Sequence, residues 1–376
     1  MPAPKLALVL SGGGARAAYQ VGVLAAIASF RPPHTPNPFA IICGTSAGAI
    51  NATAIASGAS RFAIACGRLR ELWWRLHVQD VYRADAPMVL RTGARWFASL
   101  LPGLAHRRPG SLLDNRPLAT LLEREIPFPA IRNAIDSGHL DALTITAASY
   151  VTGLSVSFCA ARSDIPLWKR AQRVGVASEL GVEHLLASSA IPFVFPAVTI
   201  GGDHFGDGAI RQVAPTAPAL HLGADRILVI GAARVATQPD AHATSKTPSL
   251  AQIGGSVLAS IFTDALGTDL EKVNLINAAV RQIPPERLPH SPIPLRDVRL
   301  MVVTPSVPLE SLALEHLQEL PRTLRVLLSG VGATGEGGAG LLSYLLFEPG
   351  YTHALIDLGW RDAHAREAAL ADFFRA

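Results

Sequence analysis

The sequence predicts an α/β fold in which a parallel-type central sheet is flanked by helices, followed by a largely helical C-terminal extension. Two short apolar runs near the N-terminus, 6–10 and 39–43, are each followed by a glycine-containing turn and an apolar helical stretch. Continuous apolar runs of this length are typical of strands that are buried on both faces of a parallel sheet. Two consecutive strand–helix units therefore favour a parallel sheet with right-handed crossovers.

The first unit leads from its strand through a glycine triplet into a helix at about 15–28. The run Arg31-Pro32-Pro33 ends this helix, because proline lacks a backbone donor and does not fit inside a helix. The second unit places a turn at 44–48 and a helix of small residues at 49–57. Both units therefore have the order strand, tight turn, helix.

The middle of the chain carries both helix and strand signals. Residues 61–125 are expected to be helical and amphipathic. Two runs with strand signals, 143–148 and 154–160, are joined by a short turn that contains glycine, which indicates a β-hairpin. The apolar run at 226–231 indicates a further buried strand.

A polar stretch at 238–249 is the best candidate for a linker. A long helical segment at about 250–281, a strand at 298–304 and more helix follow it. The sequence thus divides into an α/β domain and a mostly helical region that is able to pack on the same domain: 1–236 and 250–376.

The composition narrows the classes of function. Charged residues make up only 16% of the chain, against about 25% in an average globular domain. A weakly charged surface is expected of a protein that contacts lipid and also of one with a large alanine-rich core. The net charge is +4, but no Lys/Arg block is interleaved with aromatic residues, which argues against nucleic acid as a partner.

The segment from Trp73 to Phe97, with several arginines nearby, is a candidate for peripheral contact with a membrane. The alternative is an ordinary amphipathic helix packed on the sheet. No stretch approaches the ~18 unbroken apolar residues of a membrane span, and the first apolar run is too short for a signal peptide. Three cysteines without a CxxC pair favour a reducing compartment, so a cytoplasmic location is expected.

Gly44-Thr45-Ser46-Ala47-Gly48 matches the G-x-S-x-G pattern of a nucleophile elbow. The pattern needs a glycine two residues before and after the serine, because side chains would collide at the sharp strand-to-helix turn. Here the pentapeptide follows a predicted buried strand and opens a helix, which is the context that the motif requires. Ser46 is therefore the candidate nucleophile.

A nucleophilic serine also needs donors for the oxyanion. Gly12, Gly13 and Gly14 follow the first strand and present backbone N–H groups without side chains in the way. Because the carboxyl ends of parallel strands meet at one edge of a sheet, this loop is expected to lie beside Ser46.

The same glycines also fit a dinucleotide-binding fingerprint, G-x-G-x-x-A, from Gly12 to Ala17. Such a site needs an acidic residue at the end of the second strand, but residues 31–44 contain none. No metal-binding motif such as HExxH or an EF-hand loop is present either. No cofactor or metal is therefore expected.

The sequence offers two kinds of candidate for the general base that activates Ser46. In Asp207-Gly208-Ala209 a glycine turn could bring a carboxylate directly to the serine hydroxyl, with Asp203 as an alternative nearby. The usual partner would instead be a histidine backed by an acid, as in a Ser–His–Asp esterase. The histidines after Asp207 are not in recognisable motifs: His221, His242, His290, His316, His353 and His364.

Four segments together resemble the patatin-like phospholipases, and they occur in the order of that family: 12–16, 44–48, 187–196 and 207–209. The resemblance implies a three-layer α/β/α fold and hydrolysis of acyl esters in phospholipids or neutral lipids. It also implies a Ser46–Asp207 dyad, with an oxyanion hole from Gly12–Gly14 helped by Arg16. One difference is Ala17, where many members have a further glycine. A non-catalytic module that binds lipid or a protein partner on the same fold remains the alternative.

Overall fold

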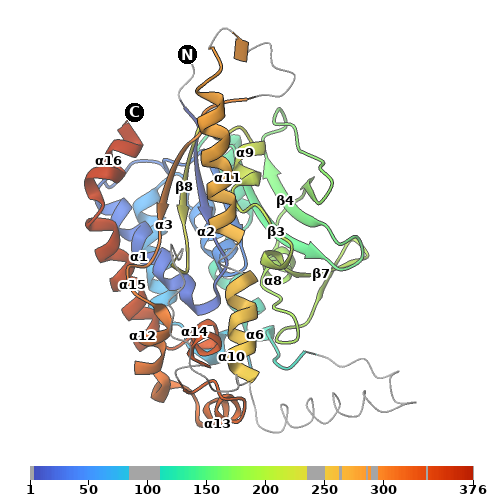
Figure 1. The fold of residues 1–376 in the computed structure, drawn as a ribbon, viewed down its shortest axis with the longest axis vertical. Coiled ribbons are helices and arrows are strands. Elements are labelled where there is room, and N and C mark those ends of the chain that lie inside the picture. Colours follow the sequence, from blue (N-terminus) through green and yellow to red (C-terminus); the bar gives the residue numbers. More distant parts are fainter. Residues whose placement is uncertain are drawn as a thin grey trace.

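The computed structural model shows a central sheet between helices (Figure 1). Its strand order is β5-β4-β3-β2-β1-β8-β9, with β7 paired to β3 and β6 paired to β7. The structure describes residues 4–83, 111–234, 250–261, 265–284, 287–288, 295–335 and 338–375. The strands have these bounds: β1 Leu6–Leu10, β2 Ile41–Thr45, β3 Ala142–Ser149, β4 Ser155–Ala161, β5 Arg173–Ala177, β6 Val198–Ile200, β7 Asp203–Asp207, β8 Arg226–Ile230 and β9 Arg299–Val303.

The predicted α/β class is confirmed. Parallel pairing joins β3, β2, β1, β8 and β9. The apolar runs of β1, β2 and β8 are buried on both faces as the sequence predicts, whereas β9 at the edge of the sheet is only partly buried. β4 returns antiparallel to β3 as the predicted hairpin. The second strand covers 41–45 rather than 39–43, because Gly44 and Thr45 continue the pairing with β3 up to Thr146.

Side chains of alternate residues on each strand enter two separate cores. Leu8 and Leu10 of β1 pack with the helices α1, α2, α3 and α15 on one face, whereas Ala7 and Val9 pack with α9 and α11 on the other. Helices on both faces make three layers. The bounds of these helices are α1 Ala18–Ser29, α2 Ala47–Ser57, α3 Phe62–Trp74, α9 Ala217–His221, α11 Ala265–Val280 and α15 Pro349–His364.

α1 and α15 lie side by side although they are far apart in the sequence (Figure 1). A Cβ atom at Gly22 of α1 would overlap the carbonyl oxygen of Ile356, and one at Gly359 of α15 would overlap that of Tyr19. The two glycines therefore allow the helix backbones to touch. Tyr19 also donates a 3.0 Å hydrogen bond to the Asp362 carboxylate across this interface.

The C-terminal region adds both a strand and helices to the molecule. β9 pairs with β8 at the edge of the sheet. The other helices of this region are α10 Leu250–Ala259, α12 Leu309–Glu315, α13 Arg322–Gly330, α14 Ala339–Leu345 and α16 Glu367–Arg375. The predicted linker at 238–249 lies outside the described residues.

The region predicted to be helical at 61–125 contains α3, α4 Val78–Val81 and α6 Arg116–Glu125. Residues 84–110, which include most of the candidate membrane-contacting segment, lie outside the described residues. Two further helices complete the fold, α7 Pro129–Asp136 and α8 Val182–Ser188. Within the described ranges, no helix combines the length and the apolar character that crossing a bilayer requires.

Candidate active site

Ser46 lies at a strained turn between β2 and α2. Its φ of 55° and ψ of −134° put it in a conformation that is costly for a residue with a side chain. Only Phe193 shares a positive φ among the non-glycine residues that the structure describes. A strained serine at this position in a strand–turn–helix unit is the geometry of a nucleophile elbow.

The two elbow glycines are needed for close packing. A Cβ atom at Gly48 would overlap the carbonyl oxygens of Leu10, the last residue of the neighbouring β1, and of Ser11, which follows it. One at Gly44 would lie 2.5 Å from the Cα atom of Ala49 on α2. Side chains at these two positions would therefore force the turn away from β1 and α2.

The ends of β2 and β7 meet along the same strand. Thr45, the last residue of β2, pairs with Thr146 of β3, and Asp207, the last residue of β7, pairs with Ala147. Because β2 runs parallel and β7 antiparallel to β3, their carboxyl ends face each other there. The Ser46 Oγ donates a 2.6 Å hydrogen bond to Asp207 Oδ2 across this junction.

The Asp207 carboxylate is almost completely buried, with 1% of the residue exposed. Burial raises the pKa of Asp207 to about 7, although hydrogen bonds from Ser46 and from the Ala209 amide lower it in part. Ala209 donates to Oδ1 at 2.9 Å. Gly208 makes this turn possible, because a Cβ there would overlap the Thr146 carbonyl oxygen.

The other candidate bases lie elsewhere. Asp203 accepts a hydrogen bond from the Ser149 Oγ at 2.6 Å, at the far end of β7. His221 stacks on Trp168. Within the described part of the chain, no histidine is hydrogen-bonded to Ser46 or Asp207. His242 and His290 lie outside the described residues.

Ser188, at the end of α8, is a site residue that the sequence analysis missed. Its Oγ accepts a 2.8 Å hydrogen bond from the Ser46 backbone amide and donates one of 2.6 Å to the Thr146 carbonyl oxygen. It therefore links the nucleophile turn to β3. The only signal in the sequence is that Ser188 falls within the 187–196 segment.

The glycine loop reaches the serine as predicted, since Gly14 and Ser46 line one cavity. Gly12, Gly13 and Gly14 are all buried. Gly14 has a φ of 55° and lies so close to the Tyr344 carbonyl oxygen that a Cβ would overlap it. Only glycine meets both conditions without strain.

The Arg16 side chain points toward the C-terminal region. Its guanidinium donates hydrogen bonds to the Ser343 Oγ at 2.6 and 2.9 Å and to Glu310 at 2.6 Å. It also lies over the Tyr344 ring, 4.1 Å from the centroid. These contacts tie the glycine loop to α12 and α14. None of the hydrogen bonds described for this guanidinium goes to Ser46 or Asp207.

The cavity beside Ser46 is small and mostly apolar. Its volume is about 50 Å³. The Trp73 indole on its wall donates a 2.8 Å hydrogen bond to the Asn51 side chain. The lining comes mainly from α2, α3, α6 and the segment after α8: Gly14, Ser46, Ala47, Ile50, Leu72, Trp73, Leu76, Val81, Leu118, Leu121, Leu122, Ser189, Ile191, Phe195, Tyr344 and Phe347.

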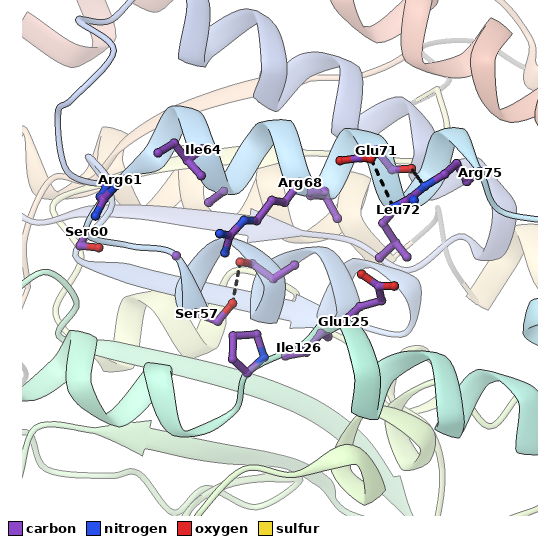
Figure 2. Close-up of a pocket in the computed structure, with 15 residues that line it drawn as sticks. Ser57, Ser60, Arg61, Ile64, Arg68, Glu71, Leu72, Arg75, Glu125 and Ile126 are labelled. Atoms are coloured by element: carbon purple, nitrogen blue, oxygen red, sulfur yellow. Dashed lines mark hydrogen bonds and ion pairs between the residues drawn. The ribbon is translucent and has the colours of Figure 1, made fainter.

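A wider groove of about 490 Å³ lies on the other side of Leu72, which lines both spaces. Figure 2 shows the Arg68 and Leu72 side chains pointing from α3 into this groove. Arg61 and Arg75 also line it, as do the acidic Glu71 and Glu125. Neither Ser46 nor Asp207 reaches the groove, so its size does not make it the reaction site.

The sequence matches a known protein family over most of the α/β domain. The model of the patatin-like phospholipase family matches residues 8–220, more than half of the chain. The chain belongs to the patatin-like phospholipase family. The matched residues include both Ser46 and Asp207.

The solved structures that resemble the chain include a human enzyme and two bacterial proteins. Human GIVD cytosolic phospholipase A2, solved with methyl gamma-linolenyl fluorophosphonate, is 13% identical with a TM-score of 0.45. The alignment covers 99% of this chain and 58% of the human protein. This chain therefore spans little more than half the length of the human protein.

Two bacterial proteins are similar at a lower level. VipD from Legionella pneumophila is 12% identical, with a TM-score of 0.32 and coverage of 95% of this chain and 67% of that one. ExoU from Pseudomonas aeruginosa, in complex with SpcU, is 16% identical, with a TM-score of 0.28 and coverage of 90% and 70%. No curated protein matches the sequence.

Proposed function

We propose that this patatin-like protein is a serine-dependent lipid acyl hydrolase of the phospholipase A or lysophospholipase type. The observation that carries the proposal is the 2.6 Å hydrogen bond from Ser46 Oγ to the buried Asp207 carboxylate, beside an apolar cavity. A carboxylate that accepts directly from the hydroxyl can take its proton without a histidine between them. The apolar lining matches the acyl chain of a lipid in polarity, and the cavity of about 50 Å³ must widen to admit a whole chain.

In the proposed reaction, Asp207 accepts the proton of the Ser46 hydroxyl while Oγ attacks the ester carbonyl carbon. The backbone amides of Gly12–Gly14 hold the negative charge that forms on the carbonyl oxygen. When the tetrahedral intermediate collapses, the bond to the leaving oxygen breaks, and that oxygen takes the proton from Asp207. The products of this step are an acyl-Ser46 enzyme and an alcohol or lysolipid.

The second half of the reaction repeats the first with water. Asp207 accepts a proton from water as the water oxygen attacks the acyl carbon. Collapse of the second intermediate releases the fatty acid and returns the proton to Ser46. The raised pKa of Asp207 makes this carboxylate a better base near neutral pH than an exposed aspartate would be.

The proposal is tested by comparing the wild type with Ser46→Ala and Asp207→Asn on a mixed lipid extract, with released fatty acids identified by mass spectrometry. Both variants are expected to lose at least about 10³-fold in kcat/KM. Asp203→Asn serves as the matched control, because its carboxylate lies at the other end of the same strand. A fluorophosphonate probe should label the wild type at Ser46.

Two results would contradict the dyad. Full activity of Asp207→Asn together with loss of activity in a histidine variant would indicate a Ser–His–Asp esterase. A folded wild type whose Ser46 is not labelled and which releases no fatty acid would indicate a non-catalytic lipid- or partner-binding module.

A further inference from the structure

Ser189 lies on the wall of the cavity that contains Ser46, directly after α8. Only 8% of the residue is exposed. Its Oγ atom is buried and has no hydrogen-bond partner among the described residues. An unpaired buried hydroxyl is unfavourable for folding, so its presence beside a nucleophile calls for an explanation.

The neighbouring residue, Ser188, has a structural role at the end of α8. The Ser188 Oγ both donates to the Thr146 carbonyl oxygen and accepts from the Ser46 amide, so its hydrogen-bonding capacity is used within the protein. Ser189 has a paired backbone, with its amide donating to the Leu185 carbonyl oxygen at 3.0 Å, but an unpaired side chain. The two adjacent serines therefore differ in the hydrogen bonding of their side chains.

A hydrogen bond of the next residue in the chain places Ser189 relative to the dyad. The Asp207 amide donates a 2.9 Å hydrogen bond to the carbonyl oxygen of Ala190, the residue next to Ser189. Ser189 therefore lies on the β3 and β7 side of the nucleophile. The glycine loop follows β1, on the opposite side of β2.

These two sides hold different oxygens of the tetrahedral intermediate. The former carbonyl oxygen belongs with the glycine amides. The leaving oxygen belongs on the Asp207 side, because it must receive its proton from that carboxyl group. A donor on the Asp207 side can stabilise the leaving oxygen as its bond to carbon breaks.

We propose that Ser189 is a further catalytic residue, whose hydroxyl donates a hydrogen bond to the leaving ester oxygen of the bound lipid. This inference rests on the proposed acyl-hydrolase function. Ser189 keeps its own proton throughout, and the proton that the alcohol carries away comes from Asp207. The class of substrate that benefits is the alkyl or glyceryl ester, whose leaving alkoxide is strongly basic.

The test compares two esters with the same short acyl chain in the wild type and Ser189→Ala. One is a glyceryl ester, and the other is a p-nitrophenyl ester, whose leaving phenolate is weakly basic and needs little help. The ratio of kcat/KM for the glyceryl ester to that for the nitrophenyl ester should fall about 10- to 100-fold, the usual effect of one charge-assisted hydrogen bond.

The melting temperature distinguishes a catalytic role of Ser189 from a structural one. Loss of a structural hydroxyl lowers the Tm, whereas loss of an unpaired one does not. Ser189→Ala removes an unpaired buried hydroxyl, so its Tm should be unchanged or higher. Ser188→Ala is the matched comparison, because it breaks two hydrogen bonds. It should lower the Tm and reduce the hydrolysis of both esters to a similar degree.

The outcomes separate this inference from the function on which it rests. If the wild type cleaves both esters and Ser189→Ala leaves their ratio unchanged, or lowers the Tm with equal losses on both, the leaving-group role is wrong and the hydrolase proposal stands. If the folded wild type cleaves neither ester and is not labelled at Ser46, both proposals are wrong.

Discussion

Asp207 is the residue whose surroundings set the pH range of the proposed reaction. Its carboxyl group has a pKa raised to about 7, mainly by burial. The proposed base must be deprotonated before it can accept the Ser46 proton. The fraction of molecules ready to react therefore increases as the pH rises through 7.

This leads to a prediction for the pH dependence of hydrolysis. With a neutral ester substrate, kcat/KM should increase about tenfold per pH unit below pH 7 and level off above it. A series of initial rates between pH 5.5 and 8.5, corrected for spontaneous hydrolysis, measures this. A flat profile over that range would contradict a base with a pKa near 7.

The same carboxylate should make the protein less stable at high pH. In the unfolded chain Asp207 loses its proton near the ordinary value of 3.8, whereas in the native state it keeps the proton up to about pH 7. Between these values the native state binds more protons, so the free energy of unfolding falls as the pH rises. The penalty is complete above pH 7 and amounts to at most about 4 kcal/mol.

Asp207→Asn should therefore be inactive but more stable than the wild type at pH 8, because asparagine carries no charge into the site. The two proteins should converge in stability as the pH is lowered to about 4. Denaturant unfolding at several pH values measures this difference. Equal stability of wild type and variant at pH 8 would show that the protein compensates the buried charge.

At the scale of helices and strands, the sequence predicts the sheet well. The apolar run at 6–10 coincides with β1, because a strand buried on both faces has no polar residue to interrupt the pattern. The bounds of β2 are less predictable, since Gly44 and Thr45 resemble a turn but remain paired with β3.

The site is predictable only where a local motif marks it. Ser46 and Asp207 stand in such motifs, although 161 residues separate them. No local motif marks the Ser188 hydroxyl or the partners of Arg16 on α12 and α14, because these contacts form only when distant segments pack together. The head-on meeting of β2 and β7 along β3 likewise depends on the tertiary fold.

The contact between α1 and α15 gives a prediction with a built-in control. Gly22→Ala should destabilise the protein, because its Cβ would overlap the backbone of α15. Gly67→Ala on α3 meets no atom within 4 Å and should stabilise the protein by up to about 1 kcal/mol, the helix preference of alanine over glycine. Thermal melting of both variants tests this, and a Gly22→Ala variant as stable as Gly67→Ala would contradict the close packing.

At the scale of the whole molecule, the C-terminal region supports the site. It supplies β9 to the sheet, α15 to the face of α1, and the Glu310 and Ser343 partners of Arg16. Without it, α1 would expose a helix face that is now buried, and the Arg16 guanidinium would lose its partners. We therefore expect 1–236 and 250–376 to fold as one unit.

A chain truncated after residue 234 should accordingly fail to fold. Circular dichroism should show no cooperative thermal transition, and Ser46 should not react with a fluorophosphonate probe. The full-length protein, treated in the same way, is the control. A truncated chain that melts cooperatively and keeps esterase activity would instead establish two independent domains.

The burial of Ser46, with 2% of the residue exposed, also has a consequence for how a lipid reaches it. An inaccessible serine hydroxyl cannot meet an ester that stays level with its neighbours in a flat bilayer. If the proposed hydrolase acts on membrane lipids, the lipid must rise out of the membrane and lose contact with the molecules around it before its acyl carbon comes near Oγ. Turnover should then depend on how easily a single lipid leaves its aggregate, so that loosely packed, strongly curved or monomeric lipids are consumed faster than ordered, flat ones.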